Sequence, residues 1–101
     1  MADEKYAVKV PKDLEDLIPM FMSNRKKEIE SLKVALAASN FEDMRQIGHR
    51  MKGSGRSYGF ATITEIGKRI EDGARGSDGG ALAACLEEYA DYLDKVVITY
   101  E

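Results

Sequence analysis

The single histidine of this 101-residue chain, His49, lies three residues before Lys52 and four residues before Gly53. A free imidazole titrates near pH ~6.5, so at neutral pH much of it is an uncharged nucleophile. A lysine three positions further along a helix lies beside the histidine, where its ammonium group can balance negative charge. A positioned nucleophile and a nearby cation are what phosphoryl transfer requires of a protein.

The surrounding residues predict a helix that turns His49 toward solvent. With an advance of ~100° per residue from Met44, an apolar stripe forms on one side, and His49 falls roughly 140° away. Gly53 falls at roughly 180°, where packing does not explain a residue that costs a helix ~1 kcal/mol relative to alanine. Its lack of a side chain leaves room for a bulky partner to approach the imidazole. The stripe consists of Ile47, Gly48, Met51 and Gly55, and the polar neighbours of His49 are Arg45, Gln46, Lys52 and Arg56.

The residues alone leave a second interpretation open. The helix could end at Gly53, with His49 and Lys52 placed favourably near the negative end of the helix dipole. Helical spacing does not decide between a capped helix end and an accessible nucleophile.

The apolar periodicity predicts four helices in all. Pro19 lies either in the first turn of the first helix or at a kink after a short leading helix. The sequences Ser39-x-x-Glu42 and Thr62-x-x-Glu65 are read as capping boxes that open the second and third helices. The first helix is expected over residues 12–38 and the last over 82–100. The second begins at residue 39, with an end that its glycines leave open, and the third begins at residue 62 and ends in a turn over residues 73–80.

Short connections between these helices predict an all-α, antiparallel up-down four-helix bundle. Residues 1–11 are expected to form an N-terminal arm, because Val8 and Val10 have no evident partner strand. The β-prone residues 97–99 are assigned to the last helix, whose long periodic pattern they follow. The chain is therefore expected to be a single domain over residues 1–101, with a bundle core at about residues 12–100.

Composition excludes several classes of function. A net charge of −3 argues against nucleic acid as the main partner. The chain has no signal peptide and no apolar run of the ~20 residues that a membrane span needs, so a cytoplasmic protein is expected. The start at Met1 favours a free-standing protein. One histidine with scattered carboxylates makes no transition-metal site, and neither a metal nor another cofactor is expected.

The remaining sulfur-containing residues are expected to be structural. Cys85 has no cysteine partner and is interpreted as a small buried residue. The methionines are interpreted as core residues, with one of the first two as a candidate for exposure near His49. They are Met20, Met22, Met44 and Met51.

The segment from His49 to Phe60, HRMKGSGRSYGF, resembles the signature of histidine-containing phosphotransfer (HPt) domains. That signature has a histidine, any residue, an aliphatic residue, Lys, Gly, and Ser or Ala, with a further Gly ten residues after the histidine. Met51 stands where Leu is commoner, an inward replacement of little consequence. The resemblance covers about residues 14–97, nearly the whole chain.

The resemblance implies roles for particular residues. His49 corresponds to the phosphorylated histidine, normally modified on Nε2, and Lys52 to the lysine that helps hold the phosphoryl group. Gly53 corresponds to the small residue that lets a receiver domain dock, and Arg45, Gln46 and Arg56 are the expected partner-binding neighbours. Glu71 is left out of the site, because a carboxylate there would repel the phosphoryl group.

The resemblance also implies a phosphoryl shuttle between His49 and aspartates of response-regulator receiver domains, with Mg²⁺ brought by the receiver. Two alternatives stay open: a receiver-docking adaptor without turnover, and the kinase-substrate domain of a chemotaxis-type histidine kinase acting in trans. The chain has no ATP-binding motif and lacks the proline-containing motif of sensor-kinase dimerisation helices. A monomeric phosphocarrier without autokinase activity is therefore expected.

Overall fold

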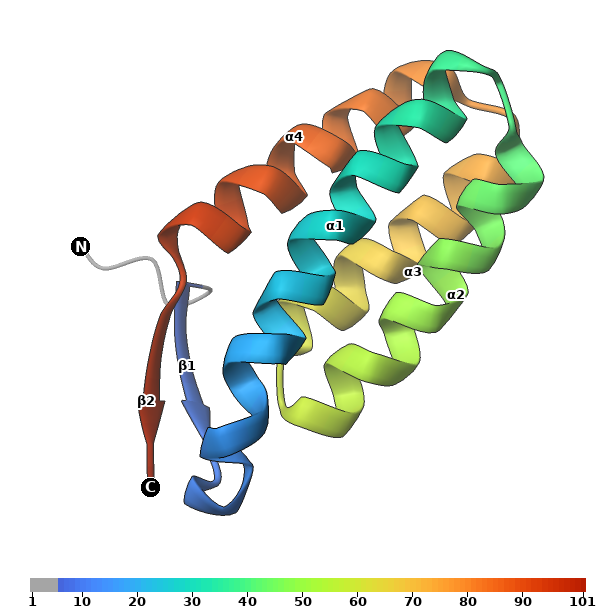
Figure 1. The fold of residues 1–101 in the computed structure, drawn as a ribbon. Coiled ribbons are helices and arrows are strands. Elements are labelled where there is room, and N and C mark those ends of the chain that lie inside the picture. Colours follow the sequence, from blue (N-terminus) through green and yellow to red (C-terminus); the bar gives the residue numbers. More distant parts are fainter. Residues whose placement is uncertain (1–5) are drawn as a thin grey trace.

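The computed structural model describes residues 6–101, and four helices make up most of this range (Figure 1). Consecutive helices run in opposite directions and are joined by short connections. Their bounds are α1 (Ile18–Ala37), α2 (Phe41–Tyr58), α3 (Ala61–Arg75) and α4 (Gly79–Lys95). The prediction of an all-α four-helix bundle is confirmed.

Pro19 lies in the first turn of α1, directly after a short 3-10 helix, η2 (Lys12–Leu17). The missing N–H of a proline removes no hydrogen bond in a first turn, because that group has no partner within the helix. Both features offered by the sequence, a leading helix and a proline near the start of the main one, are therefore present together.

Both predicted capping boxes are wrong. Asn40 is the N-cap of α2, and its side chain accepts a hydrogen bond from the backbone N–H of Asp43 at 3.2 Å. Ser39 has a positive φ of 54°, which differs from the extended backbone typical of an N-cap. The third helix begins at Ala61 without a side-chain cap, so Thr62 lies inside it.

The two ends of the described chain form a parallel strand pair, which contradicts both the lone arm and the helical C-terminus expected from the sequence. Strand β1 (Ala7–Val10) pairs with β2 (Val97–Tyr100) in a register that joins Ala7 to Val97. The last helix ends at Lys95, where Val96 turns the backbone to an extended ψ of 135°. The arm is thus not a lone segment, and residues 97–99 are not helical. Residues 1–5 of the expected arm lie outside the described residues.

The predicted core residues are largely buried. Cys85 is buried, as expected, and burial raises the pKa of its thiol. Met44 and Met51 are fully buried, whereas Met20 is 72% exposed on α1. The interpretation of the methionines as core residues therefore holds for the two on α2, and Met20 is the exposed one of the first two.

Candidate functional site

The imidazole of His49 lies on the solvent side of α2, with 68% of its side chain exposed. The helix continues past Gly53 to Tyr58 and ends at Gly59, whose φ of 86° is left-handed. The interpretation of Gly53 as the helix end is therefore wrong. A Cβ placed on Gly53 would meet nothing within 4 Å, so the space beside the imidazole is open.

The carboxylate of Glu71 lies beneath His49 and is almost completely buried. Its Oε1 accepts a hydrogen bond from Lys52 Nζ at 2.7 Å. Its Oε2 lies 3.1 Å from His49 Nδ1 and also accepts from Arg75 Nη2 at 3.2 Å. One buried carboxylate thus connects two side chains of α2 with one of α3.

Two glycines bring this carboxylate to His49. A Cβ on Gly48 would lie 2.8 Å from the backbone nitrogen of Glu71, and one on Gly67 would lie 3.0 Å from that of Lys52. The two backbones therefore approach more closely than side chains would allow. Thr64 adds a further tie by donating from Oγ1 to the carbonyl oxygen of Lys52 at 3.1 Å.

The contact with Glu71 fixes which nitrogen of His49 carries the proton. An ionised carboxylate only accepts hydrogen bonds, so Nδ1 must be the protonated nitrogen. The hydrogen bond from Lys52 is the largest factor that lowers the pKa of Glu71, with further contributions from His49 and Arg75 that together outweigh burial. Glu71 is therefore ionised at neutral pH, and the Nε2 of neutral His49 keeps its lone pair for reaction.

A family model for the Hpt domain matches residues 16–97, most of the chain. The chain belongs to the Hpt domain family. Hpt domains are phosphocarriers rather than catalytic enzymes, and they act in two-component signalling with receiver domains and histidine kinases. No curated protein and no solved structure matches the chain.

The exclusion of Glu71 from the site of this Hpt domain needs correction. It rested on repulsion between a carboxylate and a phosphoryl group, considered as an isolated pair. In the structure Glu71 contacts two cations, Lys52 and Arg75, so its charge is more than balanced. The sequence does contain a signal for the role of Glu71. This residue lies four positions after Gly67 and three before Ala74, which places it on the inner face of α3. A carboxylate on a buried face needs hydrogen-bonding or charged partners.

Two of the expected partner-binding residues of the Hpt domain, Arg45 and Gln46, bind the same side chain, Glu42. Glu42 accepts hydrogen bonds from Arg45 at 2.6 and 3.0 Å and from Gln46 at 3.0 Å, which lowers the pKa of Glu42 to about 2. Arg56 is exposed in the last turn of α2. Within the described residues, none of the three forms a hydrogen bond or ion pair with Glu71, so of the predicted residues only Lys52 joins His49 in the hydrogen-bonded cluster.

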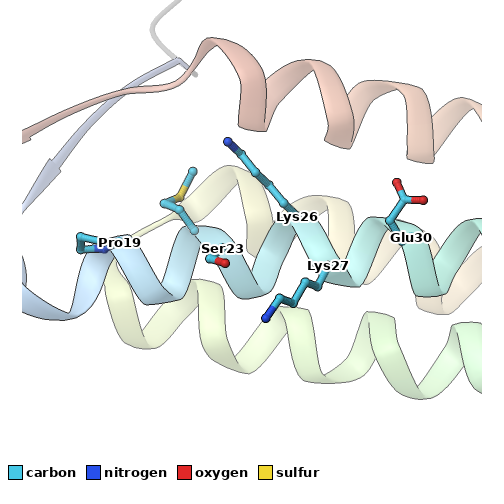
Figure 2. Close-up of a pocket in the computed structure, with 6 residues that line it drawn as sticks. Pro19, Ser23, Lys26, Lys27 and Glu30 are labelled. Carbon is cyan, nitrogen blue, oxygen red and sulfur yellow. The ribbon is translucent and has the colours of Figure 1, made fainter.

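An open groove runs along α1, has a volume of about 550 Å³, and is lined by no residue of the Glu71 cluster (Figure 2). Its lining is Pro19, Met22, Ser23, Lys26, Lys27 and Glu30. It contains no nucleophile of the kind that His49 supplies, so it is not the candidate site. Among residues 6–101, no group of three His, Cys, Asp or Glu side chains could hold a metal ion. The same range contains no helix long and apolar enough to cross a membrane.

Proposed function

We propose that this Hpt domain shuttles a phosphoryl group between His49 and aspartates of receiver domains in a two-component phosphorelay. The observation that carries the proposal is the orientation of His49. Its Nδ1 is held by the buried Glu71, while the ring is exposed and open on the side of Gly53. The reactive Nε2 is therefore available to a partner.

In the transfer step, the Nε2 lone pair of His49 forms a bond to the phosphorus of an aspartyl phosphate. The bond from phosphorus to the aspartate oxygen breaks, and its electron pair stays on the aspartate as a carboxylate. Positive charge then spreads over the imidazole ring, and the Glu71 carboxylate at Nδ1 stabilises it. The reverse reaction passes the phosphoryl group to a second receiver.

Lys52 serves as the cation of the proposed transfer. Its side chain is 30% exposed and its ammonium group binds Glu71 Oε1, which anchors it beside the imidazole. From there it balances charge that develops on the phosphoryl oxygens. The metal ion that such a transfer uses would come with the receiver domain, and the Hpt domain would need no cofactor of its own.

The surface that docks the receiver is proposed to surround Gly53. The open space there admits another protein close to Nε2. Arg45 and Gln46 lie about one helical turn before His49 on α2, and Arg56 lies about one turn after Gly53. These three residues would meet an acidic receiver site. The domain would act as a monomer, because each transfer requires one exposed imidazole and one receiver.

The test is the intact mass of the protein after incubation with phosphoramidate, a small donor that needs no cognate partner. The natural protein should gain one phosphoryl group that brief acid removes, and His49→Gln should gain none while keeping its helical circular dichroism. If the folded natural protein remained unmodified, His49 would not be a reactive acceptor. A receiver-docking adaptor without turnover would then be the better description.

A further inference from the structure

We propose that Arg75 is a positioning residue for His49: it shares one carboxylate oxygen of Glu71 with the imidazole and thereby keeps the imidazole neutral and nucleophilic. This inference rests on the proposed function of His49. It gives Arg75, on α3, a role in determining the fraction of molecules whose His49 imidazole is neutral and can react.

The geometry places Arg75 and His49 on a single atom, which faces both of them at once. Arg75 Nη2 lies 3.2 Å from Glu71 Oε2, and His49 Nδ1 lies 3.1 Å from the same oxygen. Lys52 occupies the other oxygen, Oε1, at 2.7 Å. The arginine has one further carboxylate nearby, Asp72, at 3.8 Å, and its side chain is 59% exposed. Glu71 is thus the close partner of Arg75.

The charged groups around His49 come from two helices. On α2 they are Lys52 and Arg45, the second of which is bound by Glu42. On α3 they are Glu71 and Arg75. In residues 6–101, no charged side chain of α1 or α4 forms a hydrogen bond or ion pair with His49 or Glu71.

The balance of these charges opposes protonation of His49. One buried carboxylate faces two cations, Lys52 and Arg75, so the three groups together carry one net positive charge. A positive environment disfavours the imidazolium ion, which has no lone pair on Nε2. Without Arg75 the remaining pair would be neutral. Oε2 of Glu71, which already faces Nδ1, would then stabilise a protonated His49 more strongly.

The experiment compares four proteins: the natural chain, Arg75→Ala, Arg75→Lys and Arg69→Ala. Arg69 is the matched control, because it is also an exposed arginine of α3 but binds Glu88 instead of Glu71. Two quantities are measured from about pH 6 to about pH 9, a range that brackets imidazole titration. One is the NMR titration of the His49 ring, and the other is the rate of phosphorylation by phosphoramidate relative to the natural protein at the same pH.

For Arg75→Ala we expect the His49 titration midpoint to rise by roughly 0.5 pH unit. This is the size expected when one nearby positive charge is removed and the solvent screens part of its effect on the imidazole. The relative phosphorylation rate should fall about threefold near pH 6 and return to about one near pH 9. Arg75→Lys should restore most of both values, and Arg69→Ala should change neither.

Two results would overturn the inference. An unchanged His49 titration in Arg75→Ala would show that Arg75 has no influence on the proton. A relative phosphorylation rate that was lowered by the same factor at every pH would mean that Arg75 contacts the phosphoryl group itself. If the natural protein were not phosphorylated at all, the proposed function would fail, while the NMR titration would still decide the role of Arg75.

Discussion

Gly48 and Gly67 face each other across the contact between α2 and α3, and each occupies the space that a side chain on the other would need. A Cβ on either residue would lie 2.7 Å from the carbonyl oxygen of the opposite glycine. This approach of the two backbones lets Glu71 of α3 reach the imidazole of His49 on α2. The two glycines therefore position the site by allowing α2 and α3 to approach closely.

Replacing either of these glycines is expected to destabilise the protein. In Gly48→Ala the methyl group would overlap backbone atoms, which cannot move aside as a flexible side chain can. Overpacking of this kind typically costs about 1–3 kcal/mol. Urea denaturation followed by circular dichroism should show the loss, and unchanged stability would mean that the two helices can separate at no cost.

Gly53→Ala is expected to have the opposite effect on stability. The added methyl group would meet nothing within 4 Å, and alanine is favoured over glycine in an exposed helix by about 1 kcal/mol. The same methyl group would stand where a receiver is proposed to dock. Transfer from a phosphorylated receiver should therefore slow by a larger factor than phosphorylation by phosphoramidate. Equal slowing with both donors would argue against a docking role for Gly53.

The stability of the protein should depend on pH through Glu71. Its pKa in the folded protein lies below the ordinary value of 4.5, chiefly because of the hydrogen bond from Lys52. The unfolded chain therefore binds this proton first as the pH falls. The stabilisation is fully present above the unfolded pKa and is lost as the pH falls through the folded value.

Glu71→Gln is the variant that isolates this dependence, because glutamine has nearly the same shape and does not titrate. The difference in unfolding free energy between the natural protein and Glu71→Gln should be larger near pH 5 than near pH 3. A difference that stayed constant, or grew toward pH 3, would contradict the role assigned to the ionised carboxylate.

The strand pair should contribute measurably to stability through Val10, whose side chain is completely buried. Val10→Ala is expected to cost about 2 kcal/mol through lost burial and an unfilled cavity. Val97 lies on the partner strand and is 61% exposed, so Val97→Ala is the control and should cost less than about 0.5 kcal/mol. Similar effects of the two changes would argue against β1 as part of the core.

The sequence predicts those features of this fold that have a local cause. Helical periodicity places Met44 and Met51 inward and His49 outward, because one helix face is buried along its whole length. The strand pair has no such signal. Val10 and Tyr100 pair although four helices separate them in the chain, and neither four-residue segment is long enough to indicate a strand by itself.

The site was only partly predictable for a related reason. His49, Lys52 and Gly53 lie within five consecutive positions of one helix, so their relation follows from helix geometry. Glu71 and Arg75 reach them from α3, and their role depends on how closely two helices approach. Considered as an isolated charge, Glu71 is unfavourable beside a phosphoryl group. The structure adds the two cations that reverse this conclusion.

The parallel strand pair has a mechanical consequence. Strand β1 enters the bundle and β2 leaves it, side by side and in the same direction, with Glu101 continuing the hydrogen bonding to Val10 and Lys12 (Figure 1). A force applied to the two ends of the domain would pull the strands along their length in opposite senses. Their hydrogen bonds would then bear the load together in shear instead of opening one at a time. The helix that carries His49 lies inside the loop that this contact closes, so tension would reach it only after the strands had slipped.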